Sequence, residues 1–223
     1  MRILDLFCGL GGWSQAFKDR GHEVVTVDIE QKFNPIICKD IGKLTIFDLK
    51  KAADYLSFDV VLASPPCNCF SVASIGKHWN YDGTPKKTAK KAISLVQNTL
   101  FLIKELNPKF WVMENPRGML RQLPFMKLYH RKTITQCQYG SKRMKPTDLW
   151  GKFPFLFSAR NCKNGDSCHV SAPRGSQTGT QGFATTEERA KIPYGLSEEM
   201  CRACELAIYG RTVFVSPKES ETK

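Results

Sequence analysis

Residues 2–21 read RILDLFCGLGGWSQAFKDRG, and this stretch decides the fold. The apolar run at its start predicts a buried β-strand, and the segment from Trp13 to Arg20 predicts a helix that Gly21 closes as a C-cap. The glycines between them allow a tight turn and a close approach of the backbone to a ligand. Ordinary strand–helix turns also contain glycine, but the position directly after the first strand strengthens the interpretation as a ligand site.

Three further apolar runs, over residues 23–29, 59–66 and 109–116, also predict buried strands. A long helix is predicted before the last of them, because apolar residues such as Ile93 and Val96 recur at helical spacing until Pro108. Alternating strands and helices indicate an α/β, Rossmann-like fold with a mostly parallel sheet and helices on both faces. Ligands of such folds bind at the carboxyl ends of the strands, where the glycine-rich turn lies.

The rest of the chain predicts smaller elements. Residues 131–149 predict a strand, a turn and a second strand, and residues 153–189 shift to Gly, Ser, Thr and Cys without periodicity, which predicts an irregular insertion. Residues 196–208 predict a final helix with Ser197 as its N-cap. We therefore divide the chain into an α/β domain over residues 1–150, an irregular insertion over 151–195 and, over 196–215, a C-terminal helix that packs back on the first domain.

The charge and the cysteines narrow the class of protein. The formal net charge is +12, and a basic surface attracts polyanions such as nucleic acids, although generic solubility is the alternative explanation. The 9 cysteines are an odd number in a chain that is not short, which favours a reducing interior over a disulfide framework. No apolar run approaches the about 18 residues of a membrane span, and the first residues lack the pattern of a signal peptide.

Cys67 stands in SPPCNCFS, residues 64–71, after an apolar run that predicts a strand. Two prolines before it restrict the backbone and project the thiol from a rigid platform into the cleft. A positioned thiolate is a strong nucleophile, which makes Cys67 a candidate for covalent catalysis. The alternative is a buried structural cysteine, and Cys69 is a weaker candidate for the same role.

Acidic residues follow other predicted strands. Glu114, with Asn115 after it, stands where its carboxyl can lie beside Cys67 and protonate or hydrogen-bond a ring nitrogen. Asp28 ends the second strand, and acids about 20 residues after such a turn commonly hold ribose hydroxyls. A solvated acid at a strand end is the alternative for Asp28. Asp40 lies where a third strand end would contact an adenine.

Together these residues suit one reaction, the methylation of cytosine at C5. C5 is a poor nucleophile, but addition of a thiolate to C6 makes it enamine-like when an acid relieves the charge at N3. C5 then attacks an electrophilic methyl group, and loss of the C5 proton expels the cysteine. The reaction therefore needs a cysteine, an acid and a methyl donor in one cleft.

The motifs resemble those of the DNA cytosine-5 methyltransferase family, in the family's order. DLFCGLGG at residues 5–12 is similar to its first cofactor motif, SPPCNCFS to its catalytic Pro-Pro-Cys loop and ENPRGML at 114–120 to its Glu-Asn motif. QYGSKRMKP at 138–146 resembles its basic motif more loosely. The resemblance covers roughly residues 1–150 and implies an S-adenosylmethionine-dependent methyltransferase fold. Residues 1–150 would bind the cofactor and catalyse, and 151–195 would recognise the target.

The resemblance also implies roles for individual residues. Cys67 would attack C6, Glu114 would contact N3, and Arg143 would steady the base. The residues implied to hold S-adenosylmethionine are Asp5, Phe7, Gly9, Gly11, Gly12, Asp28, Ile29, Asp40, Ile41 and Pro65. Those implied to contact the nucleic acid are Asn68, Ser71, Asn115, Lys142 and Arg174. Arg174 stands in a Gly/Thr/Gln-rich stretch that is alternatively a flexible solvated loop.

The chain departs from the family pattern at two points. Pro116 stands where the family has valine, and Arg143 is followed by Met144 and Lys145, so that Lys142 and Lys145 are alternative candidates for its work. The target base would be flipped out of double-stranded DNA. The compact chain resembles phage and prophage members of the family. We expect a monomer in the cytoplasm of a bacterial or phage-infected cell. Restriction protection is one of several biological roles that stay open.

Other functions, and a metal, stay open on the sequence alone. A tRNA cytosine-C5 methyltransferase would use the same chemistry, a modified S-adenosylmethionine would donate another group such as carboxymethyl, and a non-catalytic nucleic-acid-binding protein would keep only the fold. Zinc is a minor alternative, with candidate ligands Cys162, Cys168, His169, Cys201 and Cys204. The C-x2-C pair formed by the last two is also typical of core residues in a helix.

Overall fold

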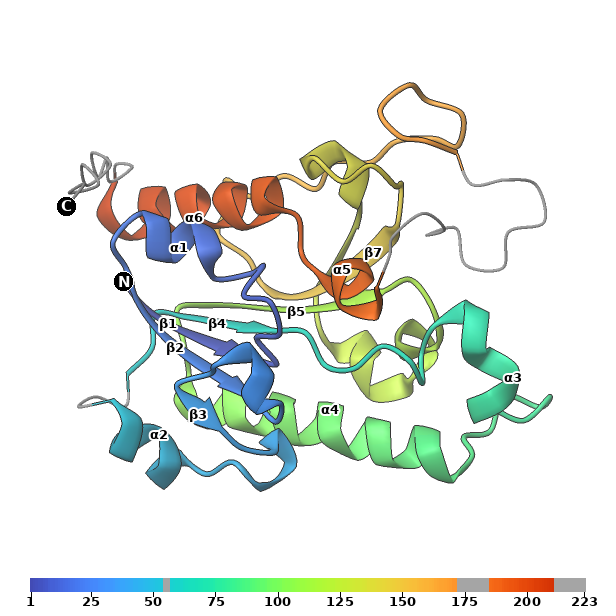
Figure 1. Ribbon diagram of the computed structural model, residues 1–223, viewed down its shortest axis with the longest axis horizontal. Helices are drawn as coiled ribbons and strands as arrows, with labels where there is room; N and C mark the ends of the chain where they lie inside the picture. Colours follow the sequence, from blue (N-terminus) through green and yellow to red (C-terminus); the bar gives the residue numbers. More distant parts are fainter. Residues whose placement is uncertain (54–56, 172–184, 211–223) are drawn as a thin grey trace.

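The computed structural model describes residues 1–53, 57–171 and 185–210. Its central seven-stranded sheet contains β1 (Arg2–Leu6), β2 (Glu23–Asp28), β3 (Ile37–Cys38), β4 (Val60–Ala63), β5 (Phe110–Pro116), β6 (Arg131–Thr135) and β7 (Pro146–Lys152). The strand order is β3-β2-β1-β4-β5-β7-β6. Strands β1 to β5 run parallel, and β7 is antiparallel to both β5 and β6. The predicted α/β fold with a mostly parallel sheet is therefore confirmed (Figure 1).

Helices cover both faces of the sheet. On one face, α2 (Ile46–Ala52) and α4 (Lys87–Leu106) pack against a core that includes Leu4, Val61 and Met113. On the other face, α1 (Gln15–Asp19) and α6 (Tyr194–Tyr209) cover a second core that includes Ile3 and Val60 (Figure 1). Neighbouring residues of one strand thus enter opposite cores, which explains why these strands are continuous apolar runs.

The long helix predicted before the last parallel strand is confirmed as α4. It ends at Leu106, because Asn107 adopts a left-handed backbone conformation with φ of 41° and Pro108 follows. The shorter helices are α3 (Ile75–His78), α5 (Thr186–Ala190) and the 3-10 helices η1 (Gln31–Phe33), η2 (Ile41–Lys43), η3 (Val72–Ser74), η4 (Met119–Gln122), η5 (Pro124–Leu128) and η6 (Gln136–Tyr139). In the described part of the chain, none of the helices has both the length and the apolar character needed to span a membrane.

The C-terminal helix begins earlier than predicted. Pro193 is the N-cap residue of α6, and Ser197 is buried inside the helix, so the predicted N-cap role of Ser197 is wrong. Its hydroxyl instead serves the other helix on this face: Ser197 Oγ accepts a hydrogen bond from Ala16 N at 3.2 Å and donates one to the carbonyl of Trp13. A buried hydroxyl must find partners, and the free backbone groups at the start of α1 provide them.

The segment predicted as an irregular insertion contains a short helix. Helix α5 begins after Thr185, whose hydroxyl accepts from Glu188 N while the Glu188 carboxylate accepts from Thr185 N, which is a capping box. Residues 159–171 are irregular, as predicted, and hold two short turns at 164–165 and 167–168. Arg174 and the whole Gly/Thr/Gln-rich stretch around it, residues 172–182, lie outside the described residues.

Candidate active site

The glycine-rich turn after β1 is held open by its backbone conformation. Phe7, Gly9 and Gly11 all have positive φ, at 60°, 48° and 72°, and for Phe7 this conformation costs about 1–2 kcal/mol. Asp28 at the end of β2 braces the turn, because its carboxylate accepts from Gly9 N and from Glu30 N, both at 2.9 Å. A β-carbon on Gly9 or Gly11 would meet nothing within 4 Å, so both glycines face open space.

This turn forms one wall of a cavity of about 210 Å³. The other wall comes from α5 and the residues directly after it. The lining residues are Phe7, Cys8, Gly9, Leu10, Gly12, Trp13, Phe33, Ser64, Glu187, Ala190, Lys191 and Ile192. Trp13 Nε1 is buried here without a hydrogen-bond partner among the described residues. An open glycine turn, three aromatic rings and an unsatisfied donor fit a nucleoside-type cofactor such as S-adenosylmethionine.

The remaining residues expected at the cofactor occupy different positions. Asp5 is buried and accepts from Ser14 Oγ at 2.6 Å, and the loss of water raises the pKa of Asp5 to about 7. Gly12 packs so closely on the backbone of Ile192 that a β-carbon would lie 2.7 Å from its carbonyl oxygen. Ile29 is exposed at the end of β2, Asp40 caps η2 by accepting from Gly42 N, and Ile41 is buried in the core.

Cys67 lies in the loop that leaves β4, and its thiol is half-buried. The carbonyl of Cys67 accepts from Phe70 N and Ser71 N, both at 2.9 Å, which turns the chain tightly after the cysteine. Before the cysteine, the carbonyl of Pro65 accepts from Asn115 Nδ2 at 2.9 Å. The Pro-Pro-Cys and Glu-Asn motifs, 50 residues apart, are therefore joined by a buried hydrogen bond.

Gly118 holds the far end of the same loop. Ser71 and Gly118 form an antiparallel bridge, and Met119 N donates to the carbonyl of Phe70 at 2.8 Å. A β-carbon on Gly118 would lie 2.1 Å from that carbonyl oxygen. The loop that carries Cys67 is thus fixed at one end by β5 and at the other by the segment that follows β5.

We expect Gly118→Ala to lower the free energy of unfolding by about 1–3 kcal/mol, because the backbone at Phe70 must move to admit the methyl group. The same movement displaces the Cys67 loop, so methyl transfer should fall as well. Denaturant unfolding measures the first effect. Gly76→Ala is the matched control, since a β-carbon on Gly76 meets nothing within 4 Å; equal stability of the two variants would contradict the contact.

Glu114 is an acid in an environment that raises its pKa. It lies in β5, is 4% exposed, and its Oε1 has no hydrogen-bond partner among the described residues. Burial raises the pKa of the Glu114 carboxyl, the Lys145 charge opposes that shift, and the Asp148 carboxylate adds to it. When this carboxyl carries a proton, it can donate a hydrogen bond to a ring nitrogen that enters the site.

Burial and the charge of Lys145 also act on the pKa of the Cys67 thiol. Burial, and then the negative charge of Glu114, raise the pKa of the Cys67 thiol, while the positive charge of Lys145 lowers it. Lys145 stands in the loop before β7 with φ of 33°, and its ammonium donates to the carbonyl of Arg189 at 2.8 Å. It is therefore the basic residue that acts on both candidate catalytic groups.

We expect Lys145→Met to move both limbs of the pH–activity profile to higher pH. Activity rises as Cys67 ionises and falls as Glu114 ionises, and loss of a positive charge disfavours both anions, so both pKa values rise. The two shifts have opposite effects on the rate at neutral pH, so the readout is the position of the two limbs and not the rate at one pH. Lys145→Arg, which keeps the charge, should restore the profile, and limbs that stay in place in Lys145→Met would refute the role.

The residues expected to contact nucleic acid are only partly gathered here. Arg143 Nη1 donates to the carbonyl of Val170 at 2.9 Å, so its described contact is with the irregular segment and not with Cys67 or Glu114. Lys142 is exposed. Asn68 and Ser71 are in the catalytic loop, and Asn68 Oδ1 accepts from Cys69 N at 3.0 Å. On the sequence, Lys145 was an alternative to Arg143 for the role of the basic residue near the base. The charge of Lys145 acts on Cys67 and Glu114, which favours Lys145 for this role.

The predicted zinc ligand set is wrong in part. Cys201 and Cys204 are fully buried in α6 within the second core. Cys201 groups there with His22 and Glu205, away from Cys162 and Cys168. The helical C-x2-C pair thus has the core role that was the alternative interpretation.

Comparison with known proteins places this geometry in context. The family model described as C-5 cytosine-specific DNA methylase matches residues 1–132. A protein of Frog virus 3 (isolate Goorha) described as "Probable DNA (cytosine-5)-methyltransferase" is 28% identical over 229 residues, which cover 92% of this chain and 100% of the relative. The type II methyltransferase M1.HphI of Haemophilus parahaemolyticus is 31% identical over 127 residues, 52% of this chain and 32% of the relative.

A solved structure shares the fold. It is a DNA modification methyltransferase, by its description, encoded within an E. coli prophage, with a TM-score of 0.50 and 18% sequence identity over 68% of this chain and 46% of that one. The chain thus spans the whole viral relative but about a third of the bacterial type II relative.

Proposed function

This chain belongs to the C-5 cytosine-specific DNA methylase family, and we propose that it transfers the methyl group of S-adenosylmethionine to C5 of cytosine in DNA, with Cys67 as the nucleophile. The observation that carries this proposal is the placement of Cys67 and Glu114. Cys67 follows β4, and Glu114 lies near the end of β5, the strand that pairs with β4. The charge of Glu114 acts on the Cys67 thiol. A nucleophile and an acid with a raised pKa at one sheet edge are what this chemistry needs.

The cavity between the glycine turn and the segment after α5 is the proposed cofactor site. Phe7, Gly9 and Gly11 would hold the cofactor through the open turn, with Asp28 as the acceptor for ribose hydroxyls. Both Asp28 oxygens already accept from backbone amides, and a carboxylate oxygen has a further lone pair to offer. When bound, S-adenosylmethionine supplies an electrophilic methyl group.

The residues of this chain then have separate tasks. The Cys67 thiolate forms a bond from Sγ to C6 of the cytosine, and Glu114 donates a hydrogen bond to N3, which relieves the charge that develops in the ring. This makes C5 nucleophilic enough to take up the methyl group. Loss of the C5 proton restores the double bond, and the bond between Sγ and C6 breaks, which frees Cys67.

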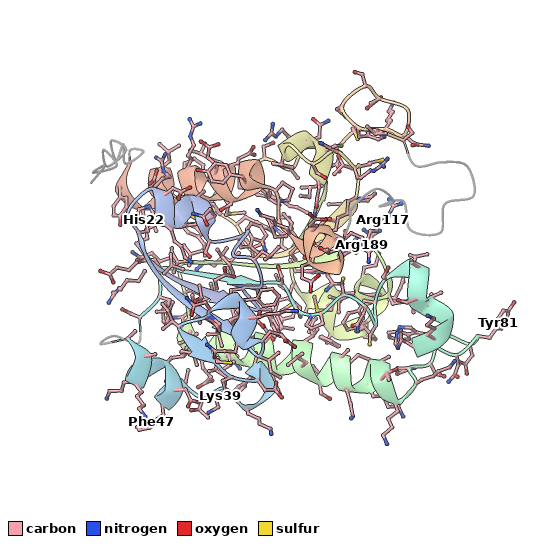
Figure 2. All side chains as sticks on the ribbon, in the orientation of Figure 1. His22, Lys39, Phe47, Tyr81, Arg117 and Arg189 are labelled. Carbon is pink, nitrogen blue, oxygen red and sulfur yellow. The ribbon has the colours of Figure 1, made fainter. Side chains whose placement is uncertain are left out.

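The rim of the site has groups that suit a nucleic acid. Arg117 and Arg189 are exposed on the side where α5 and β7 lie (Figure 2). Lys86 and Lys87 are exposed after α3, and Tyr81 projects outward from the same loop. Cations contact phosphates, and an exposed aromatic ring can stack on a base. We propose double-stranded DNA as the substrate and a monomer as the active form.

The test is a transfer assay with methyl-labelled S-adenosylmethionine and three substrates side by side: duplex DNA, single-stranded DNA and tRNA. Digestion and mass spectrometry should identify 5-methylcytosine in duplex DNA. Label in tRNA alone would keep the chemistry and overturn the substrate. Absence of label from all three, with the cofactor bound in calorimetry, would overturn the proposed activity.

A further inference from the structure

Four metal-binding side chains meet at one point outside the active site. They are Cys137, Cys162, Cys168 and His169, and their ligand atoms all lie within 4.8 Å of one another. The Sγ atoms of Cys137 and Cys162 are 3.2 Å apart, and those of Cys137 and Cys168 are 3.7 Å apart. His169 Nδ1 lies 3.7 Å from Cys162 Sγ and 3.5 Å from Cys168 Sγ.

These separations are close to those of a tetrahedral zinc site. Zn–S bonds of about 2.3 Å and Zn–N bonds of about 2.0–2.1 Å place two sulfurs about 3.8 Å apart and a sulfur and a nitrogen about 3.6 Å apart. A disulfide requires an S–S distance of about 2.05 Å, and all nine cysteines of this chain are free thiols. The spacing therefore fits a shared metal ion better than a covalent bond.

The local backbone brings the four ligands together. Cys137 comes from η6, directly after β6. Cys162 is held beside β6, because its N donates to Thr135 Oγ1 at 2.9 Å. Between Cys162 and Cys168 the chain makes a tight turn, in which Lys163 N donates to Asp166 Oδ2 at 2.7 Å and Gly165 has φ of 95°.

Two further contacts concern the environment of the ligands. Gln138 Nε2 donates to Cys168 Sγ at 3.2 Å, a hydrogen bond of the kind that supports a metal-bound thiolate. His169 Nε2 is buried and has no hydrogen-bond partner among the described residues. The polar contacts of the imidazole are therefore those of Nδ1, which faces the sulfurs.

We propose that Cys137, Cys162, Cys168 and His169 bind one structural zinc ion. Three thiolates and an imidazole are a ligand set that zinc prefers. Four protein ligands close the coordination sphere, which is typical of structural rather than catalytic zinc. This inference goes beyond the proposed methyl transfer and does not depend on it.

The site would brace the loop that leads to the active site. Directly after His169, Val170 N donates to the carbonyl of Lys142 at 2.9 Å, and the Val170 carbonyl accepts from Arg143 Nη1 at 2.9 Å. The same loop continues to Lys145, whose charge acts on Cys67 and Glu114. A metal that fixes residues 162–169 would therefore also restrain the loop of residues 142–145, which carries Lys145.

The test is the metal content of the full, untagged chain, purified under reducing conditions after expression with added zinc. Elemental analysis should find about one zinc ion per chain. Cobalt added to the metal-free chain should give the absorption of a tetrahedral thiolate complex. Cys137→Ser should lower the bound zinc at least tenfold, whereas His169→Cys, which keeps four ligands, should retain it.

The matched control is Cys38→Ser, because Cys38 is exposed and lies on β3, outside this group. It should keep the wild-type zinc content. A wild-type chain that takes up neither zinc nor cobalt would overturn the proposal, and so would Cys137→Ser with undiminished zinc. Each of these readouts is independent of methyl transfer, so failure of the zinc site is distinguishable from failure of the proposed enzyme activity.

Discussion

A Cys67→Ser chain is expected to lose methyl transfer by about 10⁴-fold or more, the scale of a removed covalent nucleophile. A hydroxyl is far less acidic than a thiol and far less nucleophilic, so addition to C6 fails. Cofactor binding should stay within about twofold, because the Cys67 side chain is not among the residues that line the cofactor cavity. The loop should also keep its shape, since the backbone carbonyl of Cys67, and not the thiol, accepts from Phe70 and Ser71.

Cys69→Ser is the control for that experiment. Cys69 is 7% exposed, and its Sγ has only long contacts, 3.7 Å to both His78 Nδ1 and the carbonyl of Thr88, so the smaller hydroxyl fits in the same space. Its transfer rate should remain within a few-fold of the wild type. Transfer by Cys67→Ser, or its loss in Cys69→Ser with normal cofactor binding, would move the nucleophile to the other cysteine.

Glu114→Gln should lower methyl transfer by about 10²–10⁴-fold, the range for a lost general acid. An amide can still hydrogen-bond a ring nitrogen, but it cannot give up a proton to it. The same change should make Cys67 more reactive toward an alkylating agent, because the Glu114 charge raises the pKa of the Cys67 thiol. One substitution thus has opposite effects on catalysis and on thiol reactivity.

The second effect is measured by alkylation of Cys67, followed by peptide mass spectrometry over the pH range where the thiol ionises. The alkylation curve of Glu114→Gln should lie at lower pH than that of the wild type. Asn115→Asp would not serve as a control, because Asn115 Nδ2 holds the carbonyl of Pro65. Gly76→Ala is a better control, because a β-carbon on Gly76 meets nothing within 4 Å. If the alkylation curves of Glu114→Gln and Gly76→Ala coincide, the electrostatic coupling between Glu114 and Cys67 is contradicted.

Four of the five parallel strands could be predicted because most of their residues are buried, whereas β3, with an exposed Cys38, has no such run. Runs such as VVLA at residues 60–63 are fully buried and need no polar positions. The long helix α4 was equally predictable, since its buried residues share one face and Asn107 and Pro108 end it. Helix α5 was missed, although Thr185 and Glu188 have the spacing of a capping box.

The side chains at the strand ends were predictable for a similar reason, because parallel strands bring their carboxyl ends to one edge. What the sequence could not provide were contacts between distant segments. Nothing in the spacing shows that Ser197 serves α1, or that Lys145 and not Arg143 acts on Cys67 and Glu114. Cys137 likewise joins Cys162 only because β6 places them side by side.

The dependence of α1 on Ser197 has a consequence for the synthesis of the protein. Ser197 donates to the carbonyl of Trp13, 184 positions earlier in the chain, and Ile192 closes over Gly12 on the wall of the cofactor cavity. A growing chain therefore makes the glycine turn well before its matching wall. The nascent protein acquires a complete cofactor pocket only after α6 has left the ribosome, so an interrupted chain would present Cys67 without a methyl donor beside it.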